Sequence, residues 1–275
     1  SRRLVERLVG ETSIEPDDIV IEIGPGKGII TDALAFRCRH VLTFEKDPQH
    51  AEIMRNRYAD RPNVTVFGAD VLEFPLPITR YKVFSNIPYN ITAAIVGKLT
   101  TGTAPPEDAW LIVQREAADR FMGYPRETLQ SVALKPWFHA EIIHQFRRQD
   151  FAPMPKVESV LLHLSRIAPP QLPLVSRERY EALVTTIFSA WKPTVIAALE
   201  SVLPGRYARA LHREFGDVLE RRPSETPGKI WIDLFNRLVE IDDPRVWRRC
   251  HEAAERLRMQ QSTLQKRAQT SVRHR

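Results

Sequence analysis

Two short motifs in this sequence carry residues whose types and spacing could do chemistry. The first, Glu22-Ile-Gly-Pro-Gly-Lys-Gly28, places three glycines at alternate positions directly after an apolar run. The second, Asn86-Ile-Pro-Tyr89, places an amide, a proline and an aromatic ring after another apolar run. Glycines let a backbone approach a ligand closely, while an amide and a ring can hold a planar polar group. The two motifs therefore indicate a ligand-binding loop and a reaction site.

The glycine motif matches neither of the two common phosphate-binding patterns. A dinucleotide fingerprint needs a third glycine where this chain has Ile29 or Thr31, and no Gly-Lys-Ser/Thr of a P-loop is present. Two acids follow the next two predicted strands: Glu45 could accept from ribose hydroxyls, and Asp70 from an adenine amine. These three loops fit an adenosine ligand without a pyrophosphate, such as S-adenosyl-L-methionine (SAM). A structural tight turn is the alternative. The expected SAM-binding residues are Gly24, Pro25, Gly26, Gly28, Glu45, Lys46, Asp70, Val71 and Asn86.

The second motif suits methylation of an exocyclic amine on a planar base. The lone pair of such an amine is delocalised into the ring, so the nitrogen is a poor nucleophile. An Asn86 oxygen and a backbone carbonyl can accept both amine hydrogens and direct the lone pair at a methyl donor. Pro88 stiffens the loop, and Tyr89 offers a face on which a flipped base can stack. The alternative is an ordinary turn with a half-buried Tyr.

Alternating strand and helix patterns surround these motifs. Because strands alternate with helices, we expect an α/β fold with a mostly parallel, doubly wound sheet. Ligands of such sheets bind beyond the carboxyl ends of the strands, where both motifs lie. Strands are predicted at 18–23, 40–45, 63–67, 81–85 and 109–113, followed by an antiparallel pair at 141–146 and 157–164.

A proline-containing linker at 167–176 precedes a part of the chain without a strand pattern. Helices are predicted there at 177–200, 207–215 and 229–239. We therefore expect a catalytic domain over 1–168, a small all-α domain over 176–243 and a basic tail over 244–275. The tryptophans expected to be core anchors are Trp110, Trp137, Trp191, Trp231 and Trp247.

The positive charge of the 275-residue chain is concentrated at its end. Residues 244–275 carry nine Lys/Arg and two acids, whereas the whole chain has a formal net charge of +6. A basic segment indicates a polyanion partner such as nucleic acid, the alternative being a solvated tail. The two cysteines, the lack of a membrane-length apolar run and the absence of a signal-peptide pattern predict a cytoplasmic protein. No histidine spacing suggests a metal.

Taken together, the motifs resemble a known family. Glu22–Gly28 with Asn86-Ile-Pro-Tyr-Asn90 is similar to the rRNA adenine N6-methyltransferases, which include KsgA-type dimethyladenosine transferases of the small subunit and Erm-type macrolide-resistance methyltransferases of the large subunit. A third block, Phe151-Ala-Pro-Met-Pro-Lys-Val-Glu-Ser-Val160, matches the family's F-x-P-x-P-K-V segment. The resemblance implies a Rossmann-like SAM-dependent methyltransferase fold over residues 4–166, with RNA binding by the helical remainder. The family usually has a Q-N-F segment before its first helix, and no residue of this sequence is assigned to it.

The resemblance also implies a role for each motif position. The three glycines would contact the methionine part of SAM, Glu45 the ribose and Asp70 the adenine amine. Asn86 would lie between SAM and the target amine, while Tyr89 and Phe151 would cover the two faces of the adenine. The expected catalytic residues are Asn86, Ile87, Pro88, Tyr89 and Phe151. The expected RNA-binding residues are Lys156, Arg245, Arg248, Arg249, Arg256 and Arg258.

Within the family, the stretches 81–98 and 129–138 are similar to the Erm branch, whereas Gln114-Arg-Glu116 is common in the KsgA branch. We therefore expect N6-methylation of an adenine in 23S rRNA, conferring macrolide–lincosamide–streptogramin B resistance. The alternatives are KsgA-type dimethylation of 16S rRNA, a non-catalytic RNA-binding factor on the same fold, and DNA adenine methylation. We expect a monomer that binds rRNA, with neither a metal nor a membrane as partner.

Overall fold

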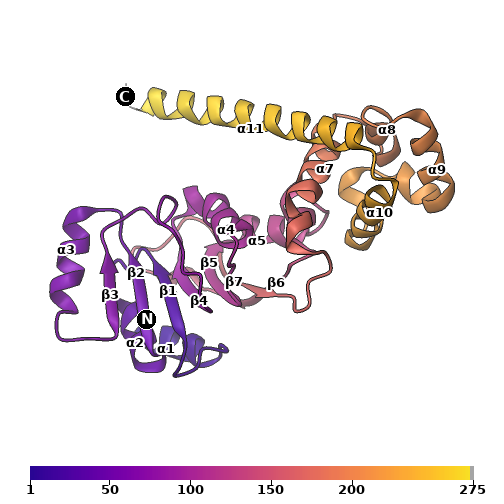
Figure 1. Cartoon of the computed structure of the whole chain (residues 1–275). Helices are drawn as coiled ribbons and strands as arrows, with labels where there is room; N and C mark the ends of the chain where they lie inside the picture. Colours follow the sequence, from indigo (N-terminus) through magenta and orange to yellow (C-terminus); the bar gives the residue numbers. More distant parts are fainter. Residues whose placement is uncertain (273–275) are drawn as a thin grey trace. The chain divides into compact units, whose positions relative to one another are not determined.

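The computed structural model describes the backbone of residues 1–272 and the side chains of residues 1–257 and 259 (Figure 1). The chain forms two compact units. The sheet unit comprises residues 1–122 and 138–168, and the helical unit comprises residues 123–137 and the chain from Pro169 onward.

The sheet unit contains a seven-stranded sheet in the order β3-β2-β1-β4-β5-β7-β6. Its first five strands run parallel, and β7 pairs antiparallel with both β5 and β6. This is the predicted mostly parallel α/β sheet with an antiparallel pair at its end. The strands are β1 (Ile19–Ile23), β2 (His40–Phe44), β3 (Val64–Phe67), β4 (Lys82–Asn86), β5 (Asp108–Gln114), β6 (Phe138–Gln145) and β7 (Ser159–Arg166).

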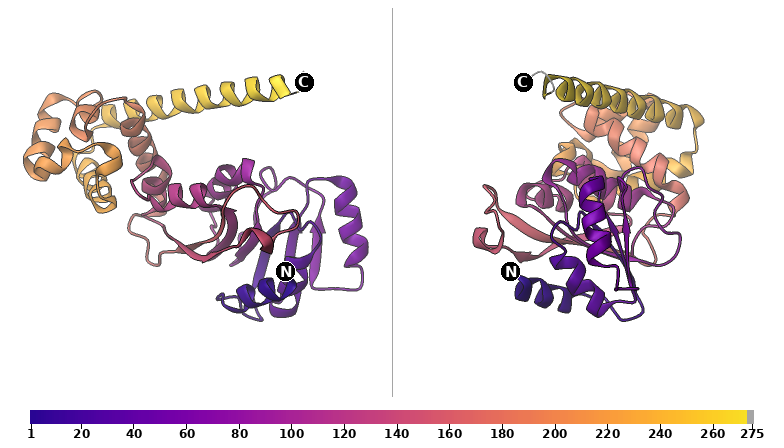
Figure 2. Two further views of the ribbon diagram at one scale, coloured as in Figure 1. Left: turned by 180° about the vertical axis from the view of Figure 1, so that it is seen from behind. Right: turned by 90° about the vertical axis from the view of Figure 1, so that its left-hand side faces the viewer.

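Helices follow each parallel strand except β3. Helix α1 packs beside α2, and α3 lies beside the outer strand β3 (Figures 1 and 2). Asp47 begins α3 by accepting hydrogen bonds from the Gln49 and His50 N–H groups at 2.8 and 3.1 Å, with Pro48 in the first turn. The helices are α1 (Arg2–Gly10), α2 (Ile29–Arg37), α3 (Pro48–Arg57), α4 (Thr92–Thr101) and α5 (Arg115–Met122).

On one face of the sheet, strand residues form a core cluster with α1 and α2. Val20, Val41, Phe84, Trp110 and Leu161 are each 2% exposed or less. Burial on this scale contributes about 1.5–3 kcal/mol per large apolar side chain. The strand ends that carry the motifs are therefore held by a rigid sheet.

The helical unit packs around buried aromatic rings. Trp137 donates to the Leu172 carbonyl at 2.9 Å, and Tyr180 to the Val132 carbonyl at 3.1 Å. Trp231 is fully buried in the same unit. Its helices are α6 (Leu129–Leu134), α7 (Arg177–Ser189), α8 (Val195–Glu200), α9 (Gly205–Phe215), α10 (Gly228–Ile241) and α11 (Pro244–Val272).

Two expectations for this unit are wrong. The predicted helix over 177–200 is two helices, because the chain leaves the helical path at Trp191, which has φ 52°, and Pro193 cannot continue the hydrogen-bond ladder. Thr194 then begins α8 by accepting from the Ala197 N–H at 3.2 Å. Trp191 is also not a core anchor, since it is 97% exposed, whereas the other four tryptophans are buried.

The first part of the segment expected to be a tail is packed in the helical unit. Helix α11 runs without interruption from Pro244 to Val272 (Figure 2). Its residues Val246, Trp247, Cys250 and Ala254 are each 5% exposed or less. The basic residues at the start of this segment therefore lie on a helix whose apolar face is packed in the helical unit.

Among the described helices, none is long and apolar enough to cross a membrane. Cys38 and Cys250 are both free and buried, and burial raises the pKa of each thiol to about 11.

Candidate active site

Both motifs lie where the strand order reverses. The sheet runs outward from β1 to β3 on one side and from β4 on the other, so the switch point lies between β1 and β4. The paired residues there are Val20 with Lys82 and Ile21 with Val83. Beyond these pairs, Ile23 is joined to Ser85, so the residues that follow them, Gly24 and Asn86, lie at the same end of the two strands. The glycine turn and the second motif therefore meet at the edge where open α/β sheets bind ligands.

At the end of β1, the Ser85 hydroxyl takes the place of the backbone hydrogen bonds that join β1 to β4. Ser85 Oγ donates to the Ile23 carbonyl at 2.6 Å and accepts from the Ile23 N–H at 3.1 Å. Ser85 is fully buried, so both backbone groups of Ile23 are satisfied away from water. The hydroxyl thus joins the last residue of β1 to β4 immediately before the two motifs.

The glycine turn needs all three of its glycines for conformational reasons. Gly24, Gly26 and Gly28 have φ of +70°, +53° and +75°, in the region that side chains other than glycine rarely adopt. A Cβ at Gly24 or Gly26 would meet nothing within 4 Å, whereas one at Gly28 would collide with the hydroxyl of Tyr58. Gly24 and Gly26 therefore leave open space for a ligand, whereas Gly28 lets the side chain of Tyr58 pack closely against the turn.

Glu22 is a site residue to which the motifs assign no role. Its carboxyl is 1% exposed and accepts from the Thr31 hydroxyl at 2.6 Å through Oε2. Its other oxygen, Oε1, is buried and has no hydrogen-bond partner within the described residues. Burial raises the pKa of Glu22 to about 8. The signal in the sequence is a carboxylate inside an otherwise apolar strand that runs into the glycine turn.

This carboxyl provides a test of whether the site fits SAM. An unpaired buried carboxyl oxygen is costly unless a polar or cationic group reaches it. SAM carries an ammonium and a sulfonium, and the open faces of Gly24 and Gly26 lie at the same strand end. The residues present therefore fit a small cationic adenosine ligand, and the glycines, Glu22 and the acids described next would hold it.

Two acids lie at the ends of the neighbouring strands. The Gly24 N–H donates to the Phe44 carbonyl at 2.8 Å, and the Glu45 N–H donates to the Phe67 carbonyl at 2.9 Å, so the three strand ends are joined. Glu45 is half-buried, and its Oε1 accepts from the Asp47 N–H at 3.0 Å. This bond orients the carboxylate and leaves Oε2 for a further donor.

Asp70 follows β3 and is oriented from two sides. Its Oδ2 accepts from Lys46 Nζ at 2.7 Å, and its Oδ1 accepts from the Leu72 N–H at 3.0 Å. The hydrogen bond from Lys46 and the one from the Leu72 backbone hold the pKa of Asp70 below its usual range. Asp70 is therefore an ionised acceptor, and the next residue, Val71, is buried. Lys46, expected among the SAM-binding residues, contacts Asp70.

The second motif alternates between anchored and exposed residues. Ile87 is buried, and its N–H donates to the Ile112 carbonyl at 3.2 Å. Tyr89 is half-buried, with its hydroxyl 2.8 Å from Ser159 Oγ on β7. Asn86 and Pro88 are exposed, and within the described part of the chain the Asn86 amide has no hydrogen-bond partner. The loop thus presents a free amide at a fixed position beside the glycine turn.

The third block lies in the connection between β6 and β7. Phe151 is half-buried and meets Phe146 edge-on, with ring centroids 5.2 Å apart, next to the core cluster that includes Leu8 and Phe84. Its ring thus has packing contacts in the sheet unit. Lys156 is exposed nearby in the chain.

The expected RNA-binding arginines of α11 fall into two groups. Arg245 pairs with Asp243 at 2.6 Å, and Arg249 donates to the Val202 carbonyl at 3.1 Å, so both have partners in the protein. Arg248 and Arg256 are exposed. The side chain of Arg258 lies outside the described residues.

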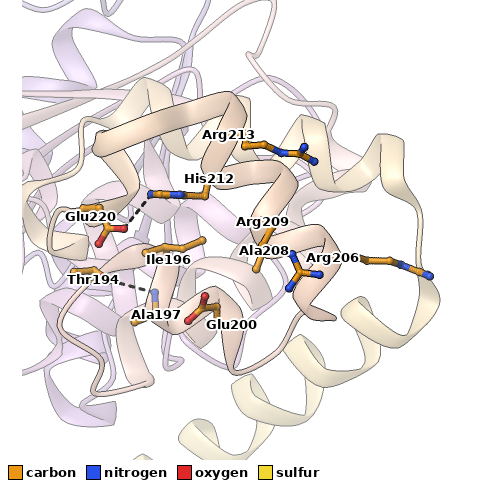
Figure 3. A pocket seen from close by; sticks show the side chains of 10 residues that line it. All are labelled: Thr194, Ile196, Ala197, Glu200, Arg206, Ala208, Arg209, His212, Arg213 and Glu220. Atoms are coloured by element: carbon orange, nitrogen blue, oxygen red, sulfur yellow. Dashed lines mark hydrogen bonds and ion pairs between the residues drawn. The ribbon is translucent and has the colours of Figure 1, made fainter.

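A cavity of about 660 Å³ in the helical unit is lined by three arginines, His212 and two acids, Glu200 and Glu220 (Figure 3). Arg206, Arg209 and Arg213 come from α9, where their spacing places them on one side of the helix. His212 contacts Glu220 at 3.0 Å. Guanidinium groups suit phosphate oxygens, so this cavity could take part of a polyanion.

No group of three or more His, Cys, Asp or Glu among the described residues could hold a metal ion.

Comparison with known proteins gives relatives from both branches of one family. The chain is 34% identical over 251 residues to an rRNA adenine N-6-methyltransferase of Saccharopolyspora erythraea, covering 89% of this chain and 64% of that protein. The chain therefore spans less than two thirds of the length of this relative. It is 30% identical over 254 residues to a ribosomal RNA small subunit methyltransferase A of Prochlorococcus marinus, covering 87% of this chain and 90% of that protein.

Solved structures show the same fold. The crystal structure of the 23S rRNA methyltransferase ErmE superposes with a TM-score of 0.74 at 33% identity, covering 86% of this chain and 98% of that one. A dimethyladenosine transferase from Plasmodium falciparum shares the fold with a TM-score of 0.72 at 21% identity, covering 86% of this chain and 96% of that one. The predicted Rossmann-like methyltransferase sheet with a helical C-terminal part is thus confirmed.

The model of the family described as ribosomal RNA adenine dimethylase matches residues 1–238, which include both motifs, the third block and most of the helical unit. The resemblance indicated by the motifs is confirmed, and this chain belongs to the ribosomal RNA adenine dimethylase family, a family of rRNA adenine N6-methyltransferases.

Proposed function

We propose that this protein uses SAM to methylate the N6 amine of an adenine in 23S rRNA. The observation that supports the proposal is the exposed, unpartnered amide of Asn86 at the end of β4, the strand that pairs with β1 and its glycine turn at the switch point of the sheet. The loops that would bind SAM and the loop that would bind the adenine are thus fixed to one another by the sheet.

Different residues of the sheet unit would bind different parts of SAM. The open faces of Gly24 and Gly26 admit the methionine part, and the unpartnered oxygen of Glu22 accepts from a cationic donor. Glu45 Oε2 accepts from the ribose hydroxyls, and the ionised Asp70 accepts from the adenine amine. Bound SAM supplies an electrophilic methyl group.

The residues of the second motif act on the target adenine. Asn86 Oδ1 accepts one hydrogen of the N6 amine, a backbone carbonyl of the loop accepts the other, and the nitrogen lone pair is then directed at the methyl. Pro88 has no N–H that would compete for these acceptors. The ring of Tyr89 stacks on the base, with Phe151 closing over its other face. The product amine loses its proton to water, so no strong base is required.

The choice of the large subunit rests on similarity. Identities of 34% and 33% are to the rRNA adenine N-6-methyltransferase of Saccharopolyspora erythraea and to ErmE, which is described as a 23S rRNA methyltransferase. Small-subunit methyltransferase A is nearly as similar, at 30% identity over 90% of its length. Dimethylation of 16S rRNA is therefore the second candidate. Methyl bulk on a 23S adenine would confer resistance to macrolide, lincosamide and streptogramin B drugs.

The basic surfaces of the chain are proposed to bind the RNA backbone. Lys156, Arg248 and Arg256 are exposed, and α9 adds the arginines of its cavity (Figure 3). Arg245 and Arg249 would contact the RNA while keeping their hydrogen-bond partners in the protein. Arg258 is also proposed to bind RNA. Because α11 is packed in the helical unit as far as Ala254, the basic segment should be tested by Arg248→Ala and Arg256→Ala rather than by deletion from Pro244.

We further propose that catalysis belongs to residues 1–168, RNA binding to 176–243 and an accessory role in RNA binding to 244–275. We also propose that the protein acts as a monomer in the cytoplasm. The two free, buried cysteines support a reducing compartment.

The test is transfer of labelled methyl from SAM by the purified protein to 23S and 16S rRNA, separately and as ribosomal subunits. The proposal expects label in 23S rRNA, mapped to one adenine by primer extension, and drug resistance in a susceptible host that expresses the protein. Label confined to 16S rRNA supports the second candidate. Absence of label in both, with retained RNA binding, supports a non-catalytic factor, and label only in duplex DNA overturns the choice of RNA.

A further inference from the structure

Trp191 combines two energetically unfavourable features. Its side chain is 97% exposed, while the other four tryptophans are between 0% and 5% exposed. Its backbone has φ 52°, a conformation that costs a residue with a side chain roughly 1–3 kcal/mol. The left-handed turn ends α7 before Pro193, but packing within the helical unit does not explain why an exposed indole stands at this turn. The feature is therefore one that a binding partner would use.

The exposed indole stands on the rim of a fixed hollow. A cavity of about 360 Å³ borders Trp191 and is lined by the end of α7, the turn after α8 and one side of α11. Thr186 Oγ1 donates to the Cys250 carbonyl at 3.2 Å, which joins α7 to α11. Arg249 donates to the Val202 carbonyl at 3.1 Å, which joins α11 to the turn after α8. The three segments that line the hollow are thus joined to one another by hydrogen bonds.

Two cations accompany the ring. Arg256 lines the same cavity, and Lys192 follows Trp191 in the chain; both side chains are exposed. Neither forms an ion pair with an acid of the described residues. A flat aromatic face beside unpaired cations matches an unpaired nucleotide, because the base can stack on the ring while the phosphate meets the cations. A neutral apolar partner would give the cations no role.

We propose that Trp191, with Lys192 and Arg256, binds one unpaired nucleotide of the rRNA substrate, at a site in the helical unit separate from the adenine to be methylated. This inference rests on the proposed function, since it takes the substrate to be RNA. Stacking on a tryptophan is tolerant of sequence, so the site anchors the RNA and does not itself select the target.

The exposure pattern makes the proposal measurable by intrinsic fluorescence. Because the other four tryptophans are buried, quenching by a single-stranded oligouridylate RNA reports Trp191. We expect the full-length protein to be quenched, and Trp191→Phe to lose the signal yet bind the oligonucleotide, measured by anisotropy, within a few-fold of wild type. Trp191→Ala is expected to bind about 5- to 100-fold more weakly, because stacking contributes about 1–3 kcal/mol per base.

The contribution of Lys192 and Arg256 is measured separately, from the salt dependence of RNA binding. Replacing Lys192 and Arg256 together by alanine should reduce the slope of log affinity against log salt by about 0.7 for each phosphate that is no longer neutralised. Arg39→Ala, at an exposed position of the sheet unit, is the matched control for removal of a guanidinium and should leave both the salt slope and the quenching of Trp191 unchanged.

Equal binding by wild type, Trp191→Phe and Trp191→Ala would overturn the inference, as would quenching by anionic lipid vesicles but not by RNA. Both variants should keep the wild-type melting temperature, because the side chain is exposed. Oligonucleotide binding does not need turnover. Loss of methyl transfer with intact quenching would therefore refute the proposed function alone, and intact transfer to 23S rRNA by Trp191→Ala with unaltered affinity would refute the inference alone.

Discussion

Ser85 Oγ donates to the Ile23 carbonyl at 2.6 Å and accepts from the Ile23 N–H at 3.1 Å. This pair of bonds ties the last residue of β1 to β4 one residue before Asn86. Any loosening between the strands would change the separation of the glycine turn and the free amide. Positioning of the two reacting groups therefore depends on a buried serine that contacts neither.

Ser85→Ala should destabilise the protein by about 1–3 kcal/mol, because it leaves two buried backbone groups of Ile23 without partners. Denaturant unfolding measures this change, and methyl transfer should fall with it. Thr43→Val is the matched control: the Thr43 hydroxyl lies in the neighbouring strand β2, is buried and has no partner among the described residues. Equal destabilisation by the two variants would refute the bridging role of Ser85.

Asn86→Ala should lower kcat by about 10²–10³-fold, the range typical of removing an oriented group that acts on the transition state. SAM affinity, measured by calorimetry, should change no more than a few-fold, and stability should not change because the amide is exposed and unpartnered. Asn90→Ala removes an exposed amide four residues along the same loop and serves as the control. Turnover that survives in Asn86→Ala would exclude the amine-orienting role.

Tyr89→Phe and Ser159→Ala should each lower methyl transfer about 5-fold, because each removes the same hydrogen bond, worth about 1 kcal/mol, while keeping the ring. The double variant should be no worse than either single one. Tyr89→Ala should reduce transfer considerably more, since it also removes the stacking surface. A double-variant cycle on kcat/KM checks both statements. Additive effects of the two single changes would show that the hydroxyl pair does not act as a unit.

Glu22 should make the stability of the ligand-free protein decrease as pH rises. Burial raises its folded-state pKa to about 8 from an ordinary value of 4.5, so the folded protein keeps a proton that the unfolded chain has released between these values. The contribution is complete below pH 4.5 and is lost as pH rises through about 8, with a slope of at most roughly 1.4 kcal/mol per pH unit.

Glu22→Gln should remove this slope in denaturant unfolding across the same window, whereas Glu73→Gln, at an exposed position, should leave it unchanged. A wild-type slope that persists in Glu22→Gln would show that the titrating group lies elsewhere.

The parts of the site predictable from sequence are those fixed by strand ends. Glu45, Asp70 and Asn86 each follow an apolar run, and in a parallel sheet the carboxyl ends of strands must meet. The missing partner of Glu22 and the bridge made by Ser85 are not predictable, because both depend on which atoms of neighbouring strands face each other. Sequence spacing does not contain that information.

The predictions for the helical unit that are wrong have a different cause. The apolar pattern of 177–200 continues through the break, so periodicity alone extends the helix, although Pro193 is a signal against it. The expected burial of Trp191 follows from residue type, which describes averages and not single positions. In the basic segment, net charge conceals the apolar spacing of Val246, Cys250 and Ala254, which packs the beginning of α11.

The measurement that tests the central claim most directly is the identity of the nucleoside that receives methyl from SAM. After transfer to rRNA and digestion to nucleosides, mass spectrometry should find the new methyl on the N6 nitrogen of adenosine, as the mono- or dimethylated nucleoside, and Asn86→Ala should abolish it while still binding SAM. Methyl on any other atom or base, or an undiminished product from Asn86→Ala, would contradict the account.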